Sequence, residues 1–97
     1  MNDPLPIEIE AQLHQWGADI ALARKRRKLR QTDVAARAGL ARQTVARVEA
    51  GHEGTPVSAY LRVMWALRLP TPRLADPELD REGRTAAQRL PELSDDF

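Results

Sequence analysis

The sequence predicts a small all-α protein, and three observations support this fold class. Residues that favour helices, such as alanine, leucine, arginine and glutamate, are abundant, whereas only 4% of the 97 residues are aromatic. Apolar residues recur at helical spacing in several segments. Glycine and proline stand between those segments, where helices end. A chain of this length has room for one folded core with appendages, and not for two independent cores.

The first expected helix covers residues 7–29. It is either one long helix or two short helices that meet at Gly17, because glycine inside a helix costs about 1 kcal/mol relative to alanine. Trp16, just before this glycine, is expected to pack the N-terminal arm onto the domain.

Three shorter helices are expected to follow. The first runs from Gln31 to Ala38 and ends at Gly39, since the left-handed residue at a helix end is usually glycine. The second covers about Arg42–Ala50 and stops at Gly51. The third covers Val57–Leu69 and is ended by two prolines. Its inward stripe is expected to comprise Val57, Leu61, Met64 and Leu67 or Arg68. Tyr60 and Trp65 are expected in the core or on a dimer surface.

The charge distribution divides the chain into three parts. Residues 1–16 carry three acids and no base, residues 17–70 carry eleven basic residues against four acids, a net charge of +7, and residues 71–97 carry four arginines against seven acids. A basic middle between acidic ends favours a core that binds a polyanion. A solvated helix face would explain the run Arg24–Arg30 equally well. We therefore expect an N-terminal helical extension at 1–16, a folded domain at 17–70 and an acidic, proline-punctuated tail at 71–97. This tail is either partly helical, with a marginal helix at Leu79–Leu90, or disordered.

Several classes of protein are disfavoured. The chain has no cysteine, so it has no disulfide, no cysteine-based zinc site and no thiol nucleophile. No secretory signal and no apolar run of about 20 residues is found, and a cytoplasmic location is expected. His14 and His52 lack the spacing of metal ligands. No catalytic constellation or phosphate-binding glycine loop is evident, so neither enzymatic activity nor a cofactor is expected.

The spacing of residues from Gln31 onward predicts a helix-turn-helix over Gln31–Ala50. Small Ala35 lies four positions after Gln31, and Gly39 lies eight positions after it. Branched Val45 and Val48 lie fourteen and seventeen positions after it. Two helices that cross through a tight turn need a small residue where the backbones approach, a glycine in the turn and a branched clamp under the second helix. A helical hairpin that shares this spacing by chance is the alternative.

Two stretches, Arg24–Ala35 and Ala38–Gly51, resemble the signature of Cro-type (xenobiotic-response-element-type) repressors. The resemblance implies a five-helix, lambda-repressor-like domain that forms a two-fold dimer on a palindromic operator, with helix Arg42–Ala50 in the major groove. It also implies that Arg24 and Glu49 form a partly buried structural ion pair. In the family pattern Gln31 binds a phosphate, and base edges are met by Ala41, Arg42, Gln43, Thr44 and Arg47.

The chemistry of these side chains suits base recognition. Arginine can bind guanine O6 and N7 with two hydrogen bonds, and glutamine can bind adenine N6 and N7. The sequence departs from the family where Arg30 and Ala41 replace the usual Ser or Thr helix caps. It departs again at His52-Glu53, where Lys or Arg is common, and at Arg68, where glycine is frequent.

The C-terminal part has a weaker resemblance of its own. The pattern Leu74-Ala75-Asp76-Pro77, Leu79-Asp80, Gly83-Arg84 and Arg89-Leu90-Pro91 is similar to HipB-like antitoxins. This resemblance implies a repressor of its own operon that binds a HipA-like serine/threonine kinase toxin. A stand-alone regulator with a disordered acidic tail is the alternative. A protein-interaction module that has lost DNA readout is a third hypothesis, which Arg42, Gln43 and Arg47 disfavour.

Overall fold

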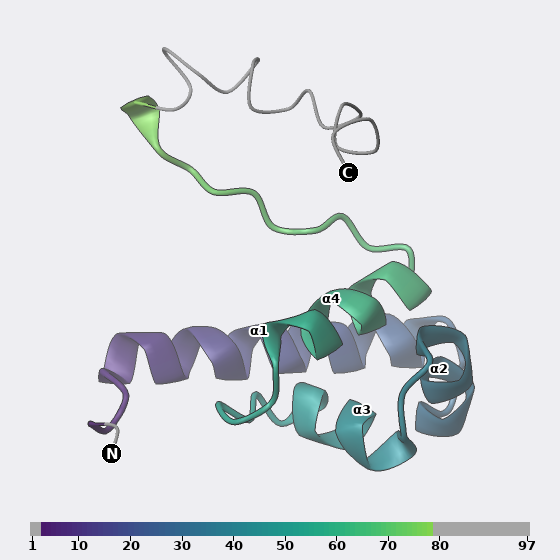
Figure 1. The fold of residues 1–97 in the computed structure, drawn as a ribbon. Helices are drawn as coiled ribbons and strands as arrows, with labels where there is room; N and C mark the ends of the chain where they lie inside the picture. Colours follow the sequence, from purple (N-terminus) through teal and green to yellow (C-terminus); the bar gives the residue numbers. More distant parts are fainter. Residues whose placement is uncertain (1–2, 79–97) are drawn as a thin grey trace, which may run out of the picture.

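The computed structural model describes residues 3–78, and this part of the chain contains four helices and no strand (Figure 1). The helices are α1 (Ile7–Arg26), α2 (Gln31–Ala38), α3 (Arg42–Glu49) and α4 (Val57–Ala66). The predicted all-α fold class is therefore confirmed. The resemblance implied five helices, whereas the described residues hold these four and a helical pair at Pro77 and Glu78, where the description stops. The helix expected at Leu79–Leu90 lies outside the described residues.

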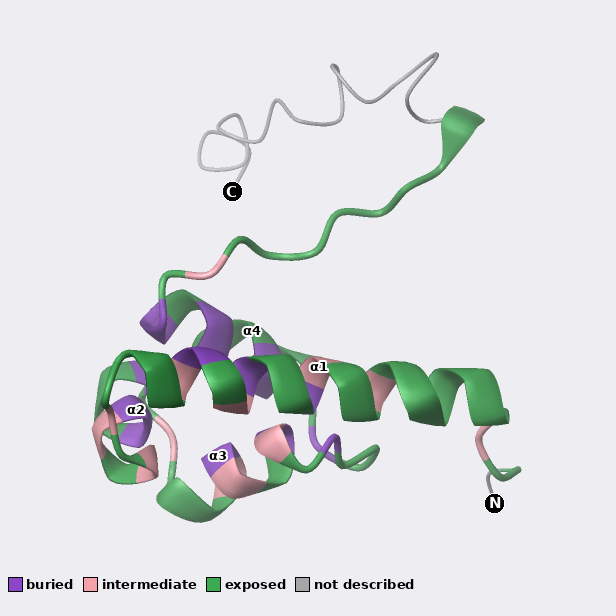
Figure 2. Cartoon of the chain, turned by 180° about the vertical axis from the view of Figure 1, so that it is seen from behind, coloured by how far each residue is buried: buried purple, intermediate pink, exposed green. Residues whose placement is uncertain are grey.

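Helix α1 is a single helix that passes through Gly17 without interruption, so the first of the two alternatives is correct. Gly17 is required by packing. A Cβ atom at this position would lie 2.5 Å from the carbonyl oxygen of Glu49 and 2.7 Å from that of Val48. The missing side chain lets α1 lie directly on the C-terminal end of α3. The N-terminal turns of α1 extend past the other helices and are exposed (Figures 1 and 2).

The turn between α2 and α3 depends on Gly39, which has φ 70° and ψ 37°, in the left-handed region. The backbone N–H of Leu40 donates to the carbonyl of Ala35 at 3.0 Å and closes the end of α2. The Arg62 guanidinium reaches from α4 and donates to the carbonyl of Ala38 at 3.0 Å. The end of α2 is thus held by its own turn and by α4.

The core lies where the four helices meet. It is built from valine and alanine on α2 and α3, with larger side chains from α1 and α4. Trp16 packs against this core, and its ring meets the buried Tyr60 ring edge-to-face with centroids 6.3 Å apart. This contact ties the middle of α1 to α4. The buried side chains include Ile20, Val34, Ala35, Ala38, Val45, Val48, Tyr60, Val63 and Leu67.

The expected inward stripe of α4 is wrong in half of its members. Met64 and Leu67 are buried, but Val57 is 64% exposed and Leu61 39% exposed. The buried face is instead completed by Ala59, Tyr60, Val63 and Ala66. Apolar residues occur on both faces of this helix, so helical spacing alone did not identify the inward one.

The chain leaves the helices after Leu69, and residues 70–78 are exposed along their whole length (Figures 1 and 2). Within residues 3–78 there is no helix with both the length and the apolar character needed to cross a lipid bilayer.

Candidate nucleic-acid interface

Helix α3 has an outer polar face and an inner apolar face. Arg42, Gln43 and Arg47 are exposed, whereas Val45 and Val48 are fully buried. The 100° step between successive residues places the first three on one side and the two valines on the other. An α-helix fits the major groove of duplex DNA, so this outer face has the size and the donors that base recognition needs.

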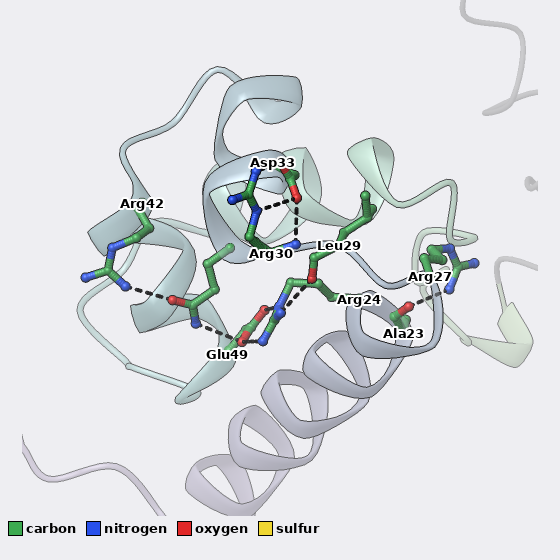
Figure 3. Close-up of polar contacts among 9 residues, drawn as sticks. Ala23, Arg24, Arg27, Leu29, Arg30, Asp33, Arg42 and Glu49 are labelled. Atoms are coloured by element: carbon green, nitrogen blue, oxygen red, sulfur yellow. Dashed lines mark hydrogen bonds and ion pairs between the residues drawn. The ribbon is translucent and has the colours of Figure 1, made fainter.

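The C-terminal end of α3 is held against α1 by an ion pair. Arg24 Nε donates to Glu49 Oε2 at 2.6 Å and Arg24 Nη2 to Glu49 Oε1 at 3.1 Å (Figure 3). The two side chains are 12% and 8% exposed. Arg24 Nη1 also donates to the carbonyl of Leu29 at 2.8 Å. One guanidinium therefore joins α1, the α1–α2 linker and α3.

The same carboxylate connects to the outer face through Gln31. Gln31 Nε2 donates to Glu49 Oε1 at 3.0 Å, and Gln31 Oε1 accepts from Arg42 Nη1 at 2.8 Å (Figure 3). These two partners fix which end of the amide is nitrogen. They leave the second hydrogen of Nε2 free for another acceptor, such as a phosphate oxygen. Arg42 is thus oriented by a chain of polar contacts that begins in α1.

The first turn of α2 is capped by Asp33. The backbone N–H of Arg30 donates to Asp33 Oδ2 at 2.7 Å, and the exposed Arg30 guanidinium also contacts this carboxylate. These hydrogen bonds hold the pKa of Asp33 below its ordinary value of 3.8, the backbone bond first. Asp33 therefore supplies one half of a capping box, the half in which an acid in the first turn accepts from the backbone N–H of the N-cap residue.

Helix α3 is preceded by the N-cap residue Ala41, which has an extended backbone conformation and provides no side-chain cap. The backbone N–H groups of its first turn therefore have no side-chain acceptor, and such groups are suited to bind a phosphate. Thr44, in the same turn, is half-buried.

The loop after α3 is held by His52. Its Nδ1 is 3.0 Å from Thr55 Oγ1, and its carbonyl accepts from the Tyr60 hydroxyl at 2.9 Å. Burial raises the pKa of Tyr60 above 10.0. His14 and His52 line one open hollow of about 410 Å³ beside Gly51. No group of three metal-ligating side chains is found in the described part of the chain.

Comparison with known proteins bears on this segment. The helix-turn-helix family model matches residues 20–59, from the second half of α1 to the start of α4. Within this segment α2, the turn at Gly39 and α3 have the arrangement of a helix-turn-helix. The helix-turn-helix family matched here supports a DNA-binding transcriptional regulator. No curated protein and no solved structure matches the chain.

Most residues singled out from the sequence lie together on the helix-turn-helix. Gln31, Ala41, Arg42, Gln43, Thr44 and Arg47 all lie on α2, on α3 or at the start of α3, and Arg24 and Glu49 lie directly behind them. Two supporting residues were missed. Asp33 carried a signal, because an acid three positions after a helix-capping site is typical of a capping box. Arg62 had no such signal in the sequence, because its hydrogen bond is to the carbonyl of Ala38, 24 residues earlier in the chain.

Proposed function

We propose that this protein is a sequence-specific transcriptional repressor that binds duplex DNA as a dimer, with α3 in the major groove. One observation supports it above the others. The exposed Arg42 of α3 is hydrogen-bonded to Gln31 of α2, and this glutamine is in turn bonded to the Arg24–Glu49 ion pair. A donor oriented before DNA arrives loses less conformational freedom on binding.

The proposed contacts divide into two kinds. Arg42, Gln43 and Arg47 meet base edges, with Ala41 and Thr44 at the side of the groove. The free Nε2 hydrogen of Gln31 and the uncapped start of α3 bind phosphates, which position the protein without reading sequence.

We further propose that the regulated gene is part of the protein's own operon and that its partner is a HipA-like kinase toxin. The support is the helix-turn-helix followed by the tail pattern that resembles HipB-like antitoxins. Most of this pattern, from Leu79 onward, lies outside the described residues. On this proposal the protein acts in the cytoplasm, as a binding protein without a cofactor. A stand-alone Cro-type regulator is the alternative, and co-purification from the native host distinguishes the two, because only the antitoxin brings down a kinase.

The DNA-binding proposal is tested by selecting duplexes from a randomised pool and comparing Arg42→Ala with Gln31→Ala. Arg42→Ala should lose preference at one base position, by about 1–3 kcal/mol between the best and the other bases. Gln31→Ala should weaken all duplexes. Because Gln31 also holds Arg42, its loss should in addition blur the position that Arg42 reads, so the double variant should be less than additive.

Arg37→Ala is the matched control, since Arg37 is an exposed arginine in the last turn of α2, outside α3. Equal losses on every sequence from Arg42→Ala, Gln31→Ala and Arg37→Ala would contradict the assignment.

A further inference from the structure

Helix α4 carries an apolar face that is open to solvent. Val57, Leu61 and Trp65 are 64%, 39% and 69% exposed, and they follow one another at intervals of four residues along one side of the helix. The opposite side of α4 is buried in the core and carries Ala59, Tyr60 and Val63, so both sides of this helix are apolar. Together Val57, Leu61 and Trp65 expose on the order of 300 Å², the size of the largest apolar patch on a typical monomer, and such a patch is often functional.

We propose that this stripe of Val57, Leu61 and Trp65 is the surface through which two copies of the chain pair, with the two α4 helices antiparallel and Leu61 on the two-fold axis. This interface supplies the dimer that the proposed function requires, and in that respect it rests on that function.

The spacing of the three side chains fits this symmetry. A two-fold axis through Leu61 brings Leu61 against itself, and it brings Val57 of one copy opposite Trp65 of the other, because both lie four residues from the centre. Each large ring then meets a small side chain, as ridges-into-grooves packing of helices requires. A parallel arrangement would set Trp65 against Trp65 and leave a gap at Val57.

The charges of the segments just before and just after α4 are complementary in the same arrangement. Exposed Glu53 lies in the loop just before α4, and exposed Arg68 lies just after it. Antiparallel pairing brings the first end of one helix beside the last end of the other, so these opposite charges approach at both rims. Rim charges chiefly select the partner and the orientation. Glu53 would repel a phosphate, and this interface gives it a different role.

The size of the stripe predicts the strength of the pairing. Stable interfaces bury about 800 Å² on each partner, well above what these three side chains offer. The pairing is therefore concentration-dependent in the free protein. No residue of α3 is in the stripe, so the outer face of the recognition helix stays free.

Sedimentation of the full chain over a range of concentrations tests the interface, with Leu61→Glu set against Leu22→Glu. Leu22 is the matched control because it is a 49% exposed leucine on α1. Leu61→Glu should weaken self-association at least tenfold, and Leu22→Glu should leave it unchanged. A monomer at every concentration, or equal losses in both variants, would overturn the proposal. A monomer is also the outcome if the chain's own tail covers the stripe.

Cysteine cross-linking tests the geometry on a chain that has no cysteine of its own. Leu61→Cys should form a disulfide-linked dimer on oxidation, because only positions close to the axis bring identical residues within the 4.4–6.8 Å Cα separation that a disulfide needs. Val57→Cys and Trp65→Cys should cross-link when mixed and not singly. Cross-linking of Leu22→Cys as efficient as that of Leu61→Cys would overturn the interface.

The two proposals fail in different ways. Pairing through α4 without any duplex binding would contradict the DNA-binding function and leave the interface standing. Binding of an isolated half-site by a chain that never pairs would contradict the interface and the dimeric mode of binding, and would leave duplex binding itself standing.

Discussion

Two helices are followed by a non-glycine residue whose backbone has a positive φ, in the left-handed region. Lys28 follows α1 with φ 58°, and Arg68 follows α4 with φ 60°. In each case the next backbone N–H reaches back into the helix, from Leu29 to Arg24 and from Leu69 to Met64. The sequence indicated that Arg68 is unusual, because glycine is frequent at its place in the family. No local feature of the sequence indicated a left-handed conformation at Lys28. Non-glycine residues adopt this conformation at a cost of about 1–2 kcal/mol.

Replacing Lys28 by glycine should therefore stabilise the protein by about 0.5–1 kcal/mol, after subtraction of the greater freedom of glycine in the unfolded chain. Lys25→Gly removes the same side chain three residues earlier, inside α1, and should destabilise by about 1 kcal/mol. The free energy of unfolding in urea measures both. Destabilisation by both variants would show that Lys28 is not strained.

At the level of whole helices, the packing between them determines which side of α4 is buried and what Gly17 does. The spacing of residues in the sequence left both questions open. The sequence located the two short helices and the turn at Gly39, because turn geometry and helix ends depend on local chemistry. It did not show which side of α4 faces inward, since that depends on where α2 and α3 lie. Gly17 was noticed for its effect on a single helix, whereas its role is the approach of α1 to α3, more than thirty residues away along the chain.

Gly17→Ala sets helix propensity against packing. Propensity alone predicts a stabilisation of about 1 kcal/mol. The new Cβ would meet the Glu49 carbonyl at 2.5 Å, and relief of such a contact with backbone shifts the helices at a cost of about 1–3 kcal/mol or more. We expect a net destabilisation by urea unfolding. Ala18→Gly, at the exposed neighbouring position, gives the propensity scale, with an expected loss of about 1 kcal/mol. A more stable Gly17→Ala protein would mean that α1 does not rest on α3.

On the scale of the whole molecule, the basic and acidic segments of the sequence correspond to different parts of the structure. The eleven basic residues of segment 17–70 lie on the four-helix body or its connections, and the acidic stretches lie before α1 begins to pack and after α4 ends. The charges therefore lie where the sequence places the folded body, and binding of a polyanion to that body stays a prediction. The sequence did not show which apolar residues of α4 lie on the surface, because the exposed stripe on α4 has the same apolar composition as a buried one.

The salt dependence of duplex binding tests this division of charge. A protein that neutralises phosphates releases counterions, so the logarithm of the binding constant should fall linearly with the logarithm of salt concentration, by about 0.9 for each phosphate contacted. Gln31→Ala removes an uncharged phosphate contact and should lower affinity while leaving this slope nearly unchanged. Arg30→Ala removes an exposed cation whose partner in the free protein is Asp33, and it should reduce the slope by about one on each subunit in which Arg30 turns to a phosphate. Fluorescence anisotropy with a labelled duplex measures both. A slope near zero in the unaltered protein would contradict phosphate binding by the basic body. The basic residues would then form a solvated surface, and the helix-turn-helix would be a protein-interaction module.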